Sequence, residues 1–189
     1  LGELSLNGEI RKLNGILPML ISAKQMGFNK FIIPEDNAME ASFIDQIQVF
    51  PVKTLKQTVG FLNGEIELKP AESKTFESAL KDHHFSHDFA YVKGQASAKR
   101  AMEIAAAGGH NILLIGPPGA GKTMLAKCFP SILPDLTFEE SLEVTKIHSV
   151  AGVLDLNKGI VVERPFRSPH HTATLIALTG GGQKAKPGE

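Results

Sequence analysis

The sequence predicts an α/β protein built from two units, and three observations lead to this prediction. Short apolar runs alternate with longer segments whose apolar residues recur at helical spacing. A more polar stretch without an apolar stripe, residues 64–87, divides the chain. A glycine-rich motif at residues 116–123 lies between an apolar run and a helical segment. We therefore expect a first unit over 1–63, a linker over 64–87 and a second unit over 88–189.

Local patterns predict each element of the first unit. Asn7 and Gly8 lie between runs that alternate polar and apolar residues, and this dipeptide favours a hairpin because both residues tolerate positive φ. Pro18 near the start of the next segment and Gly27 after it delimit a helix. The predicted helices cover residues 17–28, 37–44 and 54–64, and the predicted strands cover 30–34 and 47–52. Strands that alternate with helices favour some parallel pairing.

The second unit begins at Asp88 and repeats the alternation. Its first helical segment ends in glycine, and a later one is expected to stop at Pro130. Thr137 followed by Glu140 has the spacing of a capping box and predicts a helix start. The predicted helices cover 94–109, 122–129 and 137–149, and the predicted strands cover 111–116, 159–166 and 172–181.

Composition limits the class of protein. The 189 residues include 20 basic and 20 acidic ones, so net charge provides no general case for nucleic-acid binding, although a local basic patch stays open. The single cysteine, Cys128, cannot form an internal disulfide, and no signal segment opens the chain, so we expect a cytoplasmic protein. No apolar run reaches the roughly 18 residues of a membrane span. The chain begins at Leu1 without a methionine, and we expect it to be a fragment of a longer protein.

The glycine-rich motif matches G-x-x-x-x-G-K-[ST] in full. Its glycines let backbone N–H groups approach phosphate oxygens, and the helix that follows points its positive end at the same anion. Lys122 would reach the β- and γ-phosphates and Thr123 would ligate Mg²⁺, so these are the candidate catalytic residues. A ligand-free turn is the alternative, but chance matches to the whole motif are rare. The candidate contacts to ATP and Mg²⁺ are Gly116, Pro117, Pro118, Gly119, Ala120, Gly121, Lys122, Thr123 and Met124.

ATP hydrolysis requires further groups. P-loop ATPases hold Mg²⁺ partly through an Asp at the end of a second strand. Asp135 and Asp155 follow the motif, but neither ends a convincing apolar run. We therefore expect the catalytic carboxylates to lie beyond Glu189, and we expect this chain to bind nucleotide weakly and not to hydrolyse it.

Two stretches, GGHNILLIGPPGAGKTMLAKCFPSILP and RPFRSPHHTATLIALTGGGQKAKPGE, resemble the magnesium-chelatase-like AAA+ ATPases of the ComM/YifB type. The segment DFAYVKGQASAKRAMEIAAAGGHN resembles the part of that family before the phosphate loop, so the resemblance covers residues 88–189. Because VKGQ lies beside the adenine there, the resemblance adds Val92, Gly94 and Gln95 to the nucleotide contacts. It implies the first part of an AAA+ domain, with Walker A but truncated before Walker B.

The first unit resembles a different domain. LGELSLNGEIRKLNGILPMLISAKQMGFNKFIIPEDN is similar to the C-terminal half of the Lon-protease-like domain (ribosomal S5 domain 2-like fold) that precedes the ATPase in this family. Lon-type peptidases carry a lysine after a GGI-like turn, but here Leu17 follows Asn14-Gly15-Ile16. Leucine cannot activate a serine, and the segment that would bear the serine is absent. We expect residues 1–63 to be a non-peptidase structural or assembly domain.

The resemblance implies that the intact protein assembles into a ring, a hexamer, and hydrolyses ATP with an arginine from the neighbouring subunit. It also implies a DNA-acting motor, of the helicase or branch-migration kind used in natural transformation or recombination. Two alternatives stay open: a metal-chelatase subunit that drives Mg²⁺ insertion into a porphyrin, and an ATPase that remodels proteins. The Lon-like unit argues against the chelatase, because the chelatase motor subunits resembled here lack one.

Several basic residues and histidines lie outside the motif. The residues that could face a neighbouring subunit, the nucleotide or a channel, with packing roles as the alternative, are Arg164, Arg167, His170 and His171. A metal site at the adjacent histidines is not favoured, because neighbouring side chains in an extended segment point to opposite faces. We expect solvated side chains at His83, His84 and His87. A solvated loop, with nucleic-acid contact as the alternative, is expected around Lys184 and Lys186.

Overall fold

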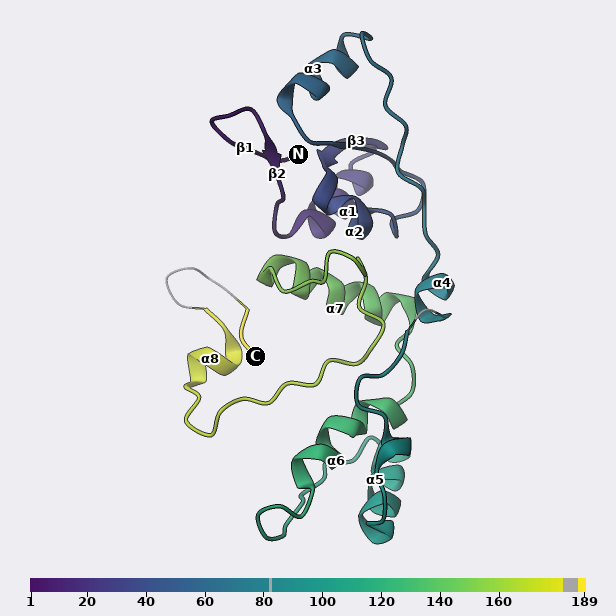
Figure 1. Ribbon diagram of the computed structural model, residues 1–189, viewed down its shortest axis with the longest axis vertical. Coiled ribbons are helices and arrows are strands. Elements are labelled where there is room, and N and C mark those ends of the chain that lie inside the picture. The colour runs from purple at the N-terminus through teal and green to yellow at the C-terminus, as the bar shows by residue number, and fades with distance from the viewer. Residues whose placement is uncertain (82, 182–186) are drawn as a thin grey trace.

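The protein is a mixed α/β molecule whose elements are spread along its long axis (Figure 1). All the named strands lie at one end, helix α7 (Phe138–Ala151) lies in the middle, and helices α5 (Ala96–Gly108) and α6 (Lys122–Cys128) lie at the other end. The candidate phosphate loop leads into α6, so the molecule holds it at the end opposite the strands. The computed structural model describes residues 1–81, 83–181 and 187–189.

The strands of the first unit form two small sheets. Strands β1 (Glu3–Leu4) and β2 (Ile10–Arg11) pair antiparallel, and Gly8 between them has a φ of 84°. This confirms the predicted hairpin, because a tight turn between strands needs residues that accept positive φ. Strands β3 (Lys30–Pro34) and β4 (Gln48–Val52) pair in parallel over their whole length, as the alternation with helices predicted.

Three helices connect and cover these strands. Helix α1 (Ile16–Gln25) buries its apolar face, whereas α2 (Ala38–Ala41) is a single turn that follows a 3-10 turn at Glu35–Asn37. Helix α3 (Leu55–Leu62) begins at the side chain of Thr54, which accepts a hydrogen bond from a backbone N–H. The main core cluster consists of Ile16, Leu17, Leu20, Phe31, Ile33, Ala41, Ile44 and Val49. These helices and strands confirm the elements predicted for the first unit.

The elements beyond residue 63 are mainly helical. One short helix, α4 (Phe76–Lys81), occurs in the polar stretch, and α5 ends at Gly109 with a φ of 65°, as its glycine predicted. Helix α6 ends at Cys128, just before Pro130, as the proline predicted, and a 3-10 turn, η3 (Phe129–Ile132), follows it directly because proline is tolerated in the first turn of a helix. Across the described residues, no helix combines the length and the apolar character that crossing a membrane requires.

Helix α7 has the predicted capping box. The Thr137 hydroxyl accepts from the Glu140 N–H at 3.2 Å, and the Glu140 carboxylate accepts from the Thr137 N–H at 3.0 Å. The helix ends at Gly152, whose φ is 73°. Its buried face is polar and carries Ser141, Thr145 and Ser149. Residues four apart lie on one face of a helix, so this polar face runs along most of α7.

Three strand predictions are wrong. Residues 111–116 form no strand, and Leu113 within them is 83% exposed. Residues 159–166 form no strand either, and 172–181 contain helix α8 (Leu175–Thr179) instead. An apolar run becomes a strand only when another strand supplies hydrogen bonds. In the described part of the chain, the named strands all belong to the first unit.

Candidate nucleotide-binding site

The candidate phosphate loop, residues 116–123, takes its shape from two glycines. Gly119 and Gly121 have φ values of 79° and 81°, a left-handed conformation that strains other residues. A Cβ at either position would meet nothing within 4 Å, so the backbone conformation and not the space requires glycine. Ala120 N–H donates to the Pro117 carbonyl at 3.3 Å and closes a turn. Because Gly121 caps α6, the free N–H groups of that helix face the loop.

Lys122 folds back over this loop. Its Nζ donates to the carbonyls of Gly116 and Pro117, each at 2.7 Å. The ammonium group therefore lies against the carbonyls at the start of the loop. Phosphate oxygens are charged and accept stronger hydrogen bonds than neutral carbonyls. The contacts that now hold Lys122 are thus ones that a bound phosphate can replace.

Thr123 and Met124 are exposed on the first turn of α6. The Thr123 hydroxyl forms no hydrogen bond with any of the described residues, so it is free to ligate a cation. Among the same residues, no three His, Cys, Asp or Glu side chains lie close enough to hold a metal by themselves. Mg²⁺ commonly binds through few protein oxygens together with substrate phosphates. The loop therefore fits Mg²⁺ as part of a magnesium–nucleotide complex.

The segment before α5 contacts the loop through one side chain. Gln95 Nε2 donates to the Ala120 carbonyl at 3.3 Å. Gln95 has a φ of 53°, uncommon for a residue other than glycine, and Gly94 before it has a φ of 69°. Val92 is only 2% exposed, so its side chain supports the core. The structure thus brings Gln95 to the loop, and the predicted adenine contacts of this segment stay a prediction.

A small apolar cluster joins α5, α6 and the 3-10 turn η2 (Phe89–Tyr91). Its buried members are Phe89, Val92, Met102, Leu125 and Cys128. Burial, with a further contribution from Asp88, raises the pKa of the Cys128 thiol. The thiol therefore stays protonated at neutral pH, which suits a small buried residue and not a nucleophile.

Ser131 links two members of this cluster through hydrogen bonds, although no sequence pattern indicates this role. Its hydroxyl accepts from the Phe89 N–H at 2.8 Å and donates to the Cys128 carbonyl at 2.9 Å. The first of these bonds joins residues 42 positions apart in the chain. Local patterns cannot indicate such a contact, because it depends on how η2 and η3 pack.

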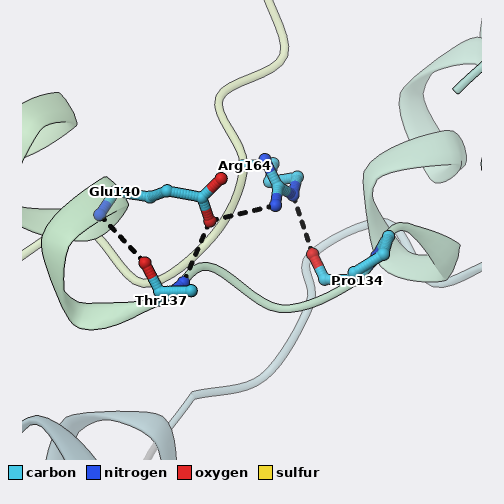
Figure 2. A network of polar contacts seen from close by, with 4 residues as sticks. All are labelled: Pro134, Thr137, Glu140 and Arg164. Carbon is cyan, nitrogen blue, oxygen red and sulfur yellow. Dashed lines mark hydrogen bonds and ion pairs between the residues drawn. The ribbon is translucent and has the colours of Figure 1, made fainter.

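Figure 2 shows where the structure places Arg164. Its Nε donates to the Pro134 carbonyl at 2.7 Å, and its Nη2 donates to Glu140 Oε2 at 3.2 Å. The same carboxylate oxygen accepts the Thr137 N–H, so Arg164 is joined to the cap of α7. Of the two predicted alternatives for Arg164, these contacts support packing.

The other candidates nearby also find partners away from the loop. Arg167 forms an ion pair with Glu189 at 2.6 Å, and His170 Nδ1 lies 2.7 Å from Thr172 Oγ1. The His170 and His171 rings pack with centroids 4.2 Å apart. The structure brings none of these side chains into a hydrogen bond or ion pair with residues 116–123.

One linker histidine differs from the prediction. The side chain of His83 is only 10% exposed, and its Nε2 lies 3.3 Å from Glu163 Oε2, so the prediction of a solvated residue is wrong there. His84 and His87 are exposed, as expected. Lys184 and Lys186, the candidates for nucleic-acid contact, lie outside the described residues.

Two family models and several relatives match this chain. The model described as "Magnesium chelatase, subunit ChlI" matches residues 88–189, and "Subunit ChlI of Mg-chelatase" matches residues 1–37. The chain is 42% identical to the competence protein ComM of Haemophilus influenzae over 99% of its length and 36% of ComM. It is 42% identical to YifB of Escherichia coli and 46% identical to the uncharacterized protein Rv2897c of Mycobacterium tuberculosis, over its full length in both cases.

A second similarity covers less of the chain. It is 38% identical over 72 residues to Lon protease 2 of Bacillus subtilis, which is 36% of this chain and 13% of that protease. Leu17, at the position where the resemblance to Lon-type peptidases places their lysine, is 1% exposed in the core of the first unit. The chain spans about 37% of the length of Rv2897c and about 36% of ComM and YifB. The family model over residues 88–189 and the identity to ComM and YifB along the whole chain show that this protein belongs to the magnesium-chelatase-like AAA+ family of the ComM/YifB type.

Proposed function

We propose that this chain binds Mg-ATP at residues 116–123, as the nucleotide-binding part of a longer AAA+ ATPase. The observation that supports this most is the convergence of two left-handed glycines, the start of α6 and Lys122 Nζ on one loop. Backbone N–H groups, the positive end of a helix and an ammonium group all favour an anion. A polyphosphate fits because the glycines leave its approach free of side chains.

Each residue then has a defined part. Lys122 exchanges the carbonyls of Gly116 and Pro117 for the β- and γ-phosphates, and Thr123 holds Mg²⁺ through its hydroxyl. Gln95 holds the Ala120 carbonyl and so keeps the loop against α5. Magnesium supplies charge that offsets the phosphates during phosphoryl transfer.

We assign hydrolysis to the longer protein. A P-loop ATPase needs a carboxylate that follows a second strand, and in the described residues no strand follows α6. Asp155 lies in a turn and accepts the Asn157 N–H at 3.0 Å, so it does not end a strand. We expect the chain to bind nucleotide weakly and to release no phosphate above background.

We further propose that residues 1–63 are the second half of a non-peptidase Lon-like domain, that 64–87 connect it, and that 88–189 begin the AAA+ domain. For the intact protein we propose a ring that moves along DNA, and the similarity to the competence protein ComM supports this. The alternative is a metal-chelatase motor, which the name of the matching family model favours. Stimulation of ATP hydrolysis by single-stranded, duplex or branched DNA in the full-length protein separates them, and no stimulation by any of these would count against the DNA motor.

Titration with a fluorescent ATP analogue in Mg²⁺ tests binding to this chain. Lys122→Ala should abolish binding, and Thr123→Ala should remove the dependence on Mg²⁺. Lys127→Ala is a matched control, because Lys127 is an exposed lysine in the last turn of the same helix. Equal affinity in the wild-type chain and in Lys122→Ala would overturn the proposed site.

A further inference from the structure

Helix α7 contacts the first unit through buried polar groups. The Ser149 hydroxyl donates to Glu40 Oε2 at 2.8 Å. The Gly15 N–H donates to the Ser149 carbonyl at 2.9 Å and to the Ser149 hydroxyl at 3.2 Å. Asn37 Nδ2 donates to the other carboxylate oxygen of Glu40 at 2.6 Å. Ser149 and Glu40 are each 3% exposed and Asn37 is 1% exposed. A buried carboxylate needs such donors, so separation of α7 from the first unit would leave Glu40 with fewer partners.

Two glycines show how closely the chain segments approach at this contact. A Cβ on Gly152, at the end of α7, would lie 2.7 Å from the Asn14 side chain. A Cβ on Gly159 would lie 2.6 Å from the Met39 carbonyl oxygen, so the two backbones touch. The packing therefore tolerates little relative movement of the first unit and α7.

The segment 159–164 also runs along α7 and is tied to it. The Val161 N–H donates to Thr145 Oγ1 at 2.9 Å, and the Ser141 hydroxyl donates to the Val161 carbonyl. Both hydroxyls belong to the buried polar face of α7. At one end of this segment Gly159 touches the first unit, and at the other end is Arg164.

Arg164 joins the other end of α7 to the nucleotide region. Its contacts with the Pro134 carbonyl and the Glu140 carboxylate hold the chain after η3 against the helix start (Figure 2). η3 continues directly from α6, whose first turn follows the phosphate loop. The 14 residues of α7 span about 21 Å at 1.5 Å per residue, with Glu140 carrying polar contacts near the start of the helix and Ser149 carrying them near its end.

We propose that α7 is a brace that couples the phosphate loop to the first unit. The surface of the first unit formed by Gly15, Asn37 and Glu40 is the docking surface, and its partner is the hydroxyl-bearing face of α7. A shift of η3 at one end must move α7 or break the Arg164 contacts, and a moving α7 disturbs the Ser149–Glu40 contact at the other. Coupling of this kind is reciprocal for equilibrium binding. The nucleotide end of the brace rests on the function proposed above.

A first experiment needs no nucleotide. Amide exchange measured by NMR should show that Arg164→Ala speeds exchange of the Gly15 amide by at least about fivefold, the lower end of common couplings between sites. Amides of β3 should change less, since they report global unfolding. Lys146→Ala is the control, because it removes an exposed pair with Glu143 on the same helix and should leave Gly15 unchanged.

Unchanged exchange at Gly15 in a folded Arg164→Ala protein would overturn the brace. Equal acceleration at Gly15 and in β3 would also count against it, because that indicates lost global stability. If Arg164→Ala loses helical circular dichroism, Arg164→Lys, which keeps the charge but not the two-pronged contact, replaces it.

A second experiment adds Mg-ATP, with binding measured separately by the fluorescent analogue. Bound nucleotide should change Gly15 exchange in the wild-type chain, and Ser149→Ala should remove this response. Binding without any change at Gly15 would overturn the brace and leave the nucleotide site intact. An absence of binding would instead overturn the proposed function, and the Arg164 experiment would then decide the coupling alone.

Discussion

The first unit and the phosphate-loop region, residues 88–134, contain similar segments but differ in how completely these are paired. In the first unit β3 pairs with β4, and Ile33 within it is fully buried. In the phosphate-loop region the equally apolar residues 111–116 form no strand, and Leu113 is 83% exposed. Helices α5 and α6 nevertheless form there, since a helix makes its hydrogen bonds internally whereas a strand depends on a neighbour.

This difference predicts that stability is concentrated in the first unit. Its core has eight buried members, whereas the cluster beneath the phosphate loop has five. Regions with few buried apolar contacts open locally at lower free energy. Variants that act on one region and not on the other test this directly.

Truncation in the first core should have the greatest effect. Leu20→Ala removes a fully buried side chain and should lower the free energy of unfolding by about 3 kcal/mol. Leu113→Ala is the matched change in the other region and should stay within about 0.5 kcal/mol of wild type. Urea unfolding followed by circular dichroism measures both. A large cost for Leu113→Ala would mean that residues 111–116 are buried in solution.

Backbone strain in the loop should lower the free energy of unfolding by less than the Leu20→Ala truncation does. Gly121→Ala adds a Cβ to a residue with a φ of 81°. This change should lower the free energy of unfolding by about 1–2 kcal/mol. Gly116 lacks a left-handed φ, and a Cβ there would lie 3.7 Å from its nearest neighbour, so Gly116→Ala should fold normally. That variant should still weaken ATP-analogue binding, because the Cβ narrows the phosphate approach. Equal stability of the two variants in urea would contradict the role assigned to Gly121.

Removal of a helix cap should destabilise the protein more in α7, at the middle of the molecule, than in the exposed helix α8. Thr137→Ala removes the hydroxyl that caps α7 and should cost about 1 kcal/mol. Thr174→Ala removes the equivalent cap of α8, a helix without buried residues, and should barely change global unfolding. Thermal unfolding of both variants makes the comparison, and a larger loss for Thr174→Ala would show that α8 contributes more to the fold than its exposure indicates.

The smallest effect should be a pH dependence at the contact between the first unit and α7. Burial raises the pKa of Glu40 above its ordinary value of 4.5, and hydrogen bonds from Ser149 and Asn37 oppose this. A carboxyl with a raised folded pKa stabilises the fold below its unfolded pKa, and this stabilisation is lost as pH rises through the folded pKa. Glu40→Gln mimics the protonated form, so near pH 7 its melting temperature should be higher than that of the wild type.

The difference in melting temperature should narrow as the pH falls, because wild-type Glu40 then becomes protonated in the fold. Glu103→Gln, which alters an exposed carboxylate paired with Arg100, provides the control and should show no such trend. If the difference in melting temperature between Glu40→Gln and wild type instead widens on acidification, the pKa of Glu40 is not raised in the fold.

The accuracy of the sequence predictions follows the range of the interactions involved. The hairpin at Gly8, the helix end at Gly109 and the capping box at Thr137 were predicted because each depends on a few neighbouring residues. The strands expected over 111–116 and 159–166 were wrong because pairing depends on segments elsewhere in the chain. In the candidate site, the motif correctly predicted a turn that leads into a helix, but the Gln95–Ala120 contact, between residues 25 positions apart, leaves no local pattern.

Local chemistry was enough to predict the turns, the caps and the turn at the glycine-rich motif, because glycine, proline and small hydroxyl residues restrict the backbone wherever they occur. Only the packing of the folded chain shows that Ser149 contacts Glu40, 109 positions earlier in the chain, and that Arg164 contacts Pro134. Such contacts arise only when buried polar groups from distant segments must satisfy one another away from water. The residues of the loop therefore predict its chemistry by themselves, whereas the contacts that join α7 to the first unit and to the chain after η3 became visible only in the folded structure.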